Sequence, residues 1–342
     1  MDFAARLLRW FDGARRDLPW RRTRDPWAIW VSEVMLQQTR VAAVTAAYDR
    51  FLTRFPDPSS FASANDDEML LVWKGLGYYR RARLLRDGAR AVVAEHGGRV
   101  PSDPDQLGRL PGVGRYTRGA IGSIAFGHAL PAIDGNVERV VARHRGIADD
   151  IATARAQKAV AAVVGAWMNS RPGDFNQALM ELGATVCTPS RPDCSACPVA
   201  QDCEGRRRGI AGELPHRRPR RTPVAITARA ALVVHRGRAL GARVPDDEPN
   251  AGQLELPGTG ILVDSGLDEL ASAIRSRYGA LLQLGAAVAE VRHAITHHRI
   301  TFVVHAATVR DRGTLSWFAI AGDTPWTTPT RKVFARLAAA EA

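Results

Sequence analysis

The chain of 342 residues lacks the features that mark membrane-spanning or exported proteins. It has no apolar run of the length that a bilayer-spanning helix needs, so we expect no membrane partner. Residues 1–11 mix charged side chains with apolar ones at helical spacing and lack the continuous apolar segment of a secretory signal, which predicts a cytoplasmic protein. With 46% hydrophobic and 24% charged residues, the composition is that of a globular chain long enough for two domains.

Lysine is scarce, and only Lys74, Lys158 and Lys332 occur, so the positive charge comes from arginine. Lys and Arg together number 47 against 35 Asp and Glu, which gives a net charge of +12. A basic surface favours a polyanionic partner because neutralising phosphates releases counterions, and nucleic acid is the first candidate. On charge alone, an equally weighted alternative is that an Arg-rich and Ala-rich chain reflects genome composition.

The chain changes character along its length. Residues 1–205 carry apolar residues at helical spacing and predict a mainly α half. Residues 206–222 are rich in arginine and interrupted by proline, which predicts a basic linker. Residues 223–342 predict a smaller α+β domain. The strand-like runs and the helical stretches of this last part lie at 230–235, 300–309, 267–275 and 330–340.

Cysteine is also scarce, and its positions are informative. The four cysteines all fall in one short segment, at Cys187, Cys194, Cys197 and Cys203. Thiols of a cytoplasmic protein stay reduced, so the segment favours a metal site over disulfides. Structural zinc usually takes two close pairs of ligands, whereas here one C-x-x-C is flanked by two isolated cysteines. We therefore expect a 4Fe-4S cluster, which takes thiolate ligands spread over a loop.

A glycine-rich turn, Leu-Pro-Gly-Val-Gly, joins two helical patterns at residues 110–114. Gly112 and Gly114 let backbone amides approach a phosphate closely, and the N-terminus of the following helix favours the anion. Taken alone, such a segment is more often only a turn between helices.

The turn, the cysteine spacing and the helical half together resemble the endonuclease III and MutY superfamily of helix-hairpin-helix DNA glycosylases. The resemblance implies a six-helix barrel and a cluster loop at 187–203. It also implies a monomer that binds double-stranded DNA in the nucleoid of a bacterium. In that superfamily the cluster shapes a basic loop against the DNA backbone, a role that falls to Arg191 here, and Gly112 and Gly114 belong to the DNA-binding hairpin.

Two carboxylates lie in segments that resemble the catalytic segments of this superfamily. Glu33 lies in Trp-Val-Ser-Glu-Val-Met-Leu-Gln-Gln-Thr and Asp134 in Ile-Asp-Gly-Asn-Val. From the residues alone, Glu33 is a surface glutamate at the edge of an apolar stripe, and Asp134 is a helix N-cap. Apolar surroundings would raise the pKa of Glu33, as a general acid at neutral pH requires, and a helix N-terminus would keep Asp134 ionised.

The Glu33 segment resembles MutY-type adenine glycosylases, which implies removal of adenine mispaired with 8-oxoguanine or guanine. Glu33 would protonate the adenine and later activate water, and Asp134 would stabilise or trap the sugar, as in retaining glycosidases. Tyr116 and Asn136 would hold these groups. Lyases of the superfamily carry a lysine where Tyr116 stands, so we expect a monofunctional enzyme.

The same resemblance assigns further contacts to DNA. A base inside a duplex must be flipped out, and Gln38 and Tyr78 would wedge beside the 8-oxoguanine. Trp20 and Arg21 would lie near the adenine pocket. From the residues alone, Gln38 would be the solvated end of a helix and Tyr78 a core aromatic residue. Trp20 would be an ordinary buried tryptophan and Arg21 an ordinary surface arginine.

The last domain resembles the MutT-like (Nudix) domain that MutY-type enzymes append to sense 8-oxoguanine. Thr296 and His297 stand where the family usually has the last two residues of Phe-Ser-His, and Ile295 replaces the aromatic. Gln253 stands where tryptophan is common. The acidic Nudix helix is missing around 264–269, so we expect recognition of 8-oxoguanine without hydrolysis.

Two alternatives stay open at this point. An oxidised-pyrimidine glycosylase with lyase activity, of endonuclease III type, shares the fold and the cluster. A non-catalytic helix-hairpin-helix protein that only binds DNA would share the hairpin.

Overall fold

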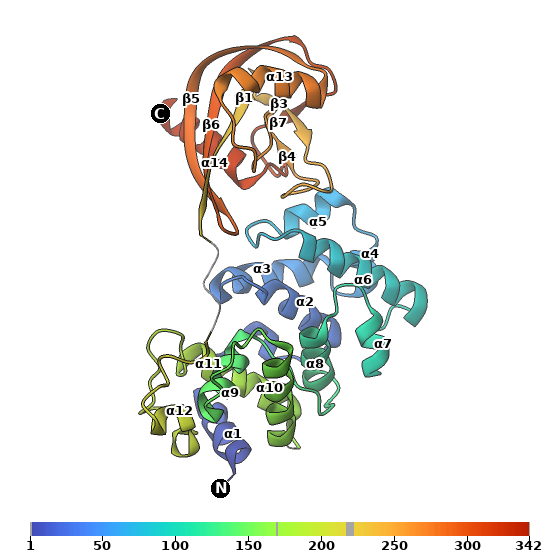
Figure 1. Cartoon of the computed structure of the whole chain (residues 1–342). Helices are drawn as coiled ribbons and strands as arrows, with labels where there is room; N and C mark the ends of the chain where they lie inside the picture. The colour runs from blue at the N-terminus through green and yellow to red at the C-terminus, as the bar shows by residue number, and fades with distance from the viewer. Residues whose placement is uncertain (1, 169, 217–221, 342) are drawn as a thin grey trace. The chain divides into compact units, whose positions relative to one another are not determined.

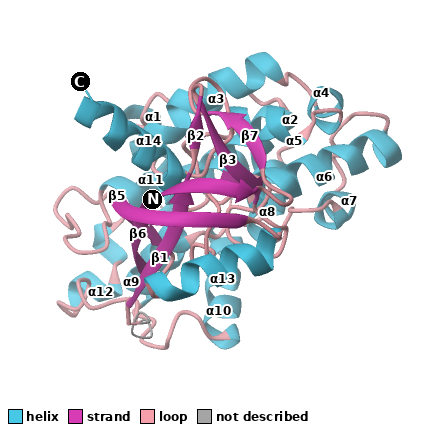
Figure 2. Cartoon of the chain, turned by 90° about the horizontal axis from the view of Figure 1, so that it is seen from above, coloured by secondary structure: helices cyan, strands magenta, loops and turns pink. Residues whose placement is uncertain are grey.

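The structure is a computed structural model that describes residues 2–168, 170–216 and 222–341. Contacts divide the chain into two compact units, Met1–Ala64 with Gly75–Pro219 and Asn65–Lys74 with Arg220–Ala342. The predicted fold class is confirmed, because the first unit is built of helices and the strands of the described residues all belong to the second. Figure 2 shows the helices and the strands in separate colours. None of the described helices is long and apolar enough to cross a lipid bilayer.

The domain boundaries predicted at 1–205, 206–222 and 223–342 stay a prediction. Residues 217–221 of the predicted linker lie outside the described residues. The part of the linker that the structure describes begins inside a short helix and then packs on the first unit, where Leu214 is buried and its carbonyl accepts a hydrogen bond from Arg143 Nε at 2.7 Å.

The first unit consists of helices joined by turns and loops (Figure 1). In chain order they are α1 (Phe3–Ala14), η1 (Pro19–Arg21), α2 (Pro26–Leu36), α3 (Val41–Arg54), α4 (Pro58–Ala62), α6 (Arg80–His96), α7 (Pro104–Arg109), α8 (Arg115–Ile124), α9 (Gly135–Arg145), α10 (Ala154–Trp167), α11 (Pro172–Thr185), η2 (Ala200–Asp202) and α12 (Glu204–Arg207). Helix α5 (Asp66–Val72) falls in the segment that groups with the second unit.

Helix α2 is the central helix of the first unit. Asp25 caps it by accepting hydrogen bonds from the amides of Trp27 and Ala28, and Pro26 fits the first turn, which has no helical hydrogen bond to lose. Every residue from Trp27 to Met35 is buried, because α2 packs against α3, α6 and α8. A helix buried on all sides holds its side chains in fixed places, and Glu33 is one of them.

A second core joins α1, α9, α10 and α11 around Leu7, Phe11, Val141 and Phe175. Helices α9 and α11 approach each other closely at Gly183, where an added Cβ would lie 2.6 Å from the Cβ of Asn136. Glycine is needed there because any side chain would push the two helices apart. This contact fixes the N-terminal turn of α9 next to α11.

Among the described residues, the second unit contains two sheets and, besides α5, two helices. Its elements are β1 (Val224–Leu232), β2 (Val234–His235), β3 (Arg238–Arg243), β4 (Leu254–Glu255), α13 (Leu267–Tyr278), β5 (Leu281–Ile295), β6 (His298–Asp311), β7 (Ser316–Ala319) and α14 (Thr328–Glu341). One sheet has the order β1-β6-β5, with β1 parallel and β5 antiparallel to β6 (Figure 1), and the other has the order β2-β3-β4 with β7 on β3. Helices α13 and α14 pack against β5.

Candidate active site

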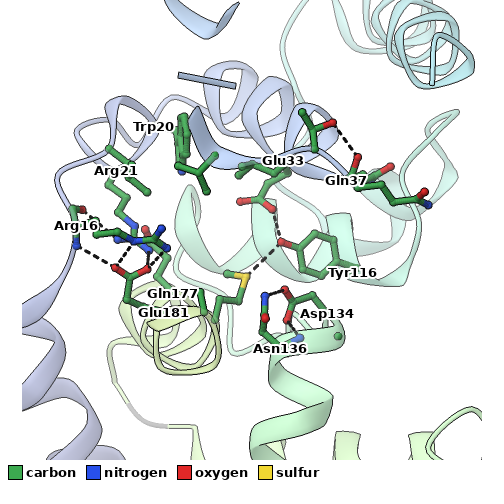
Figure 3. Close-up of a pocket in the computed structure, with 18 residues that line it drawn as sticks. Arg16, Trp20, Arg21, Glu33, Gln37, Tyr116, Asp134, Asn136, Gln177 and Glu181 are labelled. Carbon is green, nitrogen blue, oxygen red and sulfur yellow. Dashed lines mark hydrogen bonds and ion pairs between the residues drawn. The ribbon is translucent and has the colours of Figure 1, made fainter. Parts of the chain in front are cut away.

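A pocket of about 420 Å³ opens in the first unit between segments that are far apart in the sequence. It collects seven residues that the sequence analysis singled out: Trp20, Arg21, Glu33, Gln38, Tyr116, Asp134 and Asn136. Figure 3 shows the side chains of Glu33 and Tyr116 pointing toward each other, with Asp134 and Asn136 close to Tyr116. The two carboxylates therefore face one cavity.

Glu33 is a buried carboxyl at this pocket, only 5% exposed. Burial raises its pKa from the ordinary 4.5 to about 7, a hydrogen bond from the Tyr116 hydroxyl opposes that rise, and the charge of Asp134 adds to it. The surface position that the residue pattern alone favoured is wrong, since α2 is buried on every side. A carboxyl with such a pKa holds a proton for much of the time at neutral pH and can donate it.

Tyr116 lies in the first turn of α8 and donates its hydroxyl proton to Glu33 Oε2. The Tyr116 hydroxyl oxygen also lies 3.3 Å from Met180 Sδ. Burial, with the charge of Glu33, raises the pKa of Tyr116 well above its ordinary value, so the hydroxyl remains a donor. Tyr116 thereby fixes the orientation of the Glu33 carboxyl.

Asp134 is the N-cap of α9, as the sequence predicts. One of its oxygens accepts from the amides of Asn136 at 2.9 Å and Val137 at 2.8 Å, and the other accepts from Asn136 Nδ2 at 2.7 Å. Asn136 Oδ1 in turn accepts from Arg139 Nη2 at 2.8 Å. The N-cap and the catalytic assignment are thus compatible, because these donors hold a carboxylate that also lines the cavity.

The other side of the pocket holds a second buried glutamate, which the sequence analysis did not identify. Glu181 on α11 is 1% exposed and accepts from Arg16 Nε at 2.8 Å, Arg16 Nη2 at 2.7 Å and Arg21 Nη2 at 2.8 Å. Burial acts to raise its pKa, but the two guanidinium groups outweigh burial and lower it to about 2. Glu181 gives no local signal because its partners lie about 160 residues away in the chain.

The four cysteines line a second, smaller pocket in the first unit, together with Arg143 and Arg206. Arg143 Nη1 lies 3.4 Å from Cys187 Sγ, so a positive charge faces the thiols. Within the part of the chain that the structure describes, no three His, Cys, Asp or Glu side chains lie close enough together to hold a single metal ion. Four thiols around one pocket fit the wider thiolate set of an iron–sulfur cluster.

Comparison with known proteins shows the family of the chain. Residues 31–165 match the family described as HhH-GPD superfamily base excision DNA repair protein. An adenine DNA glycosylase of Mycolicibacterium smegmatis is 43% identical over 217 residues, which are 63% of this chain and 73% of that protein. The chain belongs to the adenine DNA glycosylase family of this superfamily.

Other relatives match a similar share of the chain. The adenine DNA glycosylase of Homo sapiens is 51% identical over 216 residues, which are 60% of this chain and 40% of the human protein. A solved structure of a thermostable thymine-DNA glycosylase is 30% identical, has a TM-score of 0.55 and covers 60% of this chain and 95% of that one. The chain thus spans less than half the length of the human relative.

The hairpin of this family is present where the sequence predicts it, between α7 and α8. Asp103 caps α7 through the amides of Asp105 and Gln106, and Gly114 is the N-cap of α8. Gly112 has φ +77, and a Cβ there would lie 3.0 Å from Leu84 Cβ. Glycine is needed at 112 for the backbone, whereas Gly114 leaves open space in front of the helix N-terminus.

Gln38 and Tyr78 have an unusual backbone. Their φ angles are +56 and +48, and Thr296, at the turn between β5 and β6, has +52. Residues other than glycine seldom adopt positive φ angles, and such backbone strain is found more often at functional sites than elsewhere. Gln38 lines the pocket, whereas Tyr78 is 48% exposed and is not among the residues that line it.

Of the remaining predicted contacts, Arg191, Thr296 and His297 are not among the residues that line the pocket, whereas Trp20 lines it. Arg191 is exposed in the cysteine loop, where its carbonyl accepts from the Thr188 hydroxyl at 2.6 Å. Thr296 is exposed and His297 half-buried in the second unit. Trp20 packs edge-on against Tyr48 with ring centroids 5.6 Å apart. The roles assigned to these residues stay predictions.

Proposed function

We propose that the protein removes adenine mispaired with 8-oxoguanine or guanine from double-stranded DNA by hydrolysing the N-glycosidic bond. One observation carries the proposal: Glu33, with a pKa raised to about 7, shares a pocket with Asp134. A neutral acid and a carboxylate facing one cavity are the pair that glycoside hydrolysis uses. The relatives named adenine DNA glycosylase support adenine as the base.

In the proposed reaction, Glu33 gives its proton to a ring nitrogen of the flipped adenine. The bond between the sugar carbon and the base nitrogen then breaks, and its electron pair leaves with the adenine. Water attacks the sugar carbon and gives a proton to the Glu33 carboxylate, which restores the acid. Tyr116 keeps the carboxyl in place by donating to Glu33 Oε2.

Asp134 faces the sugar in this scheme. Positive charge develops on the sugar as the bond breaks, and a fixed carboxylate stabilises it without reorganising. The three donors at 2.7–2.9 Å keep the carboxylate in that orientation. The same geometry allows an Asp134 carboxylate oxygen either to stabilise the charged sugar or to form a covalent bond to the sugar carbon.

We propose that strand cleavage through a Schiff base is absent. That chemistry needs a neutral amine at the sugar, and Lys74, Lys158 and Lys332 are not among the described residues that line the pocket. Arg16 and Arg21 line it, but guanidinium groups stay protonated and attack carbon poorly.

We propose that Cys187, Cys194, Cys197 and Cys203 hold a 4Fe-4S cluster, with Arg143 balancing the charge of the thiolates. The cluster would supply structural cross-linking of the loop rather than chemistry on the base. Arg191 and the hairpin at Gly112 and Gly114 would contact the DNA backbone. The exposed turn with Thr296 and His297 would contact 8-oxoguanine.

A single-turnover assay on three duplexes tests the proposed function. The duplexes contain adenine opposite 8-oxoguanine, adenine opposite guanine, and thymine glycol. We expect excision from the first two and none from the third, with strand breaks only after alkali. Excision of thymine glycol with direct strand cleavage would favour an endonuclease III-type enzyme. Binding of all three without excision would favour a non-catalytic DNA-binding protein.

Two substitutions give the matched control. Glu33→Gln keeps the size of the side chain and removes the titrating group, so excision should stop while DNA binding remains. Glu95→Gln makes the same change at an exposed position of α6 and should leave the rate unchanged.

A further inference from the structure

Arg81 lies in the first turn of α6, and its guanidinium lies between the C-terminal end of α2 and the loop that precedes α6. Nη1 lies within hydrogen-bonding distance of the carbonyl oxygens of Val34, at 2.7 Å, Met35, at 2.9 Å, and Gln37. Nη2 lies 3.0 Å from the carbonyl oxygen of Leu76 and 3.1 Å from that of Gly77. It also lies 3.0 Å from the Thr39 hydroxyl. One side chain therefore binds two segments separated by about 40 residues.

The first of these segments is the C-terminal end of α2. The last carbonyls of a helix have no helical amide to accept from, and a cation at this end also meets the negative pole of the helix dipole. Val34 and Met35 directly follow Glu33 in this turn. Burial lowers the pKa of Arg81 to about 10, which still leaves the guanidinium protonated at neutral pH.

The second observation is that each segment adjoins or contains a residue with a strained backbone, Gln38 in the first and Tyr78 in the second. Gln38 lies between Gln37 and Thr39, and Tyr78 follows Gly77, so each strained residue adjoins acceptors of Arg81. The Arg81 guanidinium also faces the Tyr78 ring, 5.5 Å from its centroid. A strained conformation costs about 1–3 kcal/mol and persists only where the surroundings fix it.

We propose that Arg81 is a positioning residue that joins Gln38 and Tyr78 into one rigid element for opening the DNA duplex and ties this element to Glu33. The inference rests on the proposed function. Its partner is the duplex around the target adenine, whose unstacking costs a few kcal/mol. If Gln38 and Tyr78 are already ordered before binding, the free energy of ordering them is not added to the free energy of opening the DNA.

Arginine suits this role for a geometric reason. Its two terminal nitrogens point in different directions from one plane, so each can serve one segment, whereas lysine has a single nitrogen. Thr39 provides a second link between the same segments, because its hydroxyl oxygen lies 3.2 Å from the Leu76 carbonyl oxygen. Thr39→Val removes this link and keeps the shape of the side chain.

The matched pair Arg81→Lys and Arg80→Lys tests the inference, because Arg80 is the exposed neighbour in the same helical turn. With adenine opposite 8-oxoguanine in a fully paired duplex, R81K should lower the single-turnover rate about 10- to 100-fold. The loss should shrink to about threefold or less when the flanking pairs are mismatched, since opening such a duplex costs less. R80K should change neither rate by more than about twofold.

A second readout separates positioning from chemistry and from simple destabilisation. In the Glu33→Gln background, 2-aminopurine at the target position brightens when it leaves the base stack. R81K should reduce this rise and T39V should reduce it less, while R80K should not. The pH profile of excision by R81K should match that of the wild type.

Two outcomes overturn the inference. One is an R81K protein as active as the wild type on paired duplexes. The other is a loss that is equal on paired and mismatched duplexes and follows a lowered melting temperature, since a merely structural role would give that pattern. If the wild type excises no adenine yet R81K still impairs flipping, the proposed function fails and the role of Arg81 stands.

Discussion

Two buried glutamates line one pocket, and their surroundings give them opposite properties. Glu33 on α2 meets a neutral hydroxyl and a second carboxylate, and its pKa rises to about 7. Glu181 on α11 meets two guanidinium groups, and its pKa falls to about 2. Burial alone therefore does not keep a carboxyl protonated at neutral pH, because the charges of its neighbours decide whether the pocket favours the protonated or the ionised form. The α2 side can give up a proton, whereas the α11 side holds an ionised carboxylate that is paired with two guanidinium groups.

The difference between the two glutamates should appear most strongly in catalysis when each is replaced by glutamine. Glu33→Gln removes the proton donor, so the single-turnover rate at saturating enzyme should fall by about 10³-fold or more. Glu181→Gln removes the carboxylate that orients Arg16 and Arg21 but leaves the proton donor in place, so we expect a smaller loss of rate. Rate and apparent affinity are read from enzyme titrations on one duplex. Equal losses of rate in both variants would contradict the assigned difference.

The same two variants should differ in the pH dependence of stability. The folded state raises the pKa of Glu33 from 4.5 to about 7, so its contribution is fully present below pH 4.5 and is lost as pH rises through about 7. Relative to the wild type, E33Q should therefore gain up to about 3 kcal/mol as pH rises from about 4.5 to 8.

Glu181 has the opposite sign. Its pKa is lowered from 4.5 to about 2, so its stabilisation is present above pH 4.5 and is lost as pH falls toward 2. E181Q should be less stable than the wild type at neutral pH, by an amount that shrinks in acid. Thermal unfolding across pH measures both trends, with Glu95→Gln as the control, and parallel curves for E33Q and E181Q would refute the opposite shifts.

Substitution of a glycine on the α11 side should lower the stability of the fold. Gly183→Ala places a Cβ 2.6 Å from Asn136 Cβ, which should cost about 1–3 kcal/mol of unfolding free energy. Gly165→Ala is the matched control in α10, where a Cβ meets nothing within 4 Å and should stabilise the helix by about 0.5–1 kcal/mol. Denaturant unfolding gives both values, and equal effects would contradict the close approach of α9 and α11.

The smallest effect should come from the hydroxyl beside Glu33. The hydrogen bond from Tyr116 lowers the pKa of Glu33, so Tyr116→Phe should raise this pKa and move the alkaline fall of the excision rate to higher pH. The maximal rate should drop about tenfold, because the carboxyl loses its fixed orientation. The pH–rate profile checks both points. A shift to lower pH would show that the hydroxyl does not stabilise the ionised form.

Much of the catalytic side could be predicted from the sequence, because its signals are local. The resemblance pointed to Glu33 and Asp134, and both line the pocket. Asp134 caps α9 where the short-range pattern places it. Glu181 and Arg16 were missed, since an isolated glutamate between Met180 and Leu182 looks like any other helix residue until the fold brings its arginines to it.

The second unit shows a different limit. The strands β1 and β6 and the helices α13 and α14 overlap the predicted stretches. The long strand β5 was missed because most of its first half is exposed on the sheet, so hydrophobic alternation is weak there. Backbone strain at Gln38 and Tyr78 is likewise invisible in sequence, since it depends on contacts that Arg81 makes from α6.

Infrared difference titration of the wild type against Glu33→Gln tests the central claim most directly, because it reports the protonation of one carboxyl. We predict a protonated-carboxyl band that is present in the wild type, is missing from the variant and disappears with a midpoint near pH 7. A midpoint near the ordinary pKa of 4.5, or a spectrum unchanged by the substitution, would contradict a general acid at Glu33.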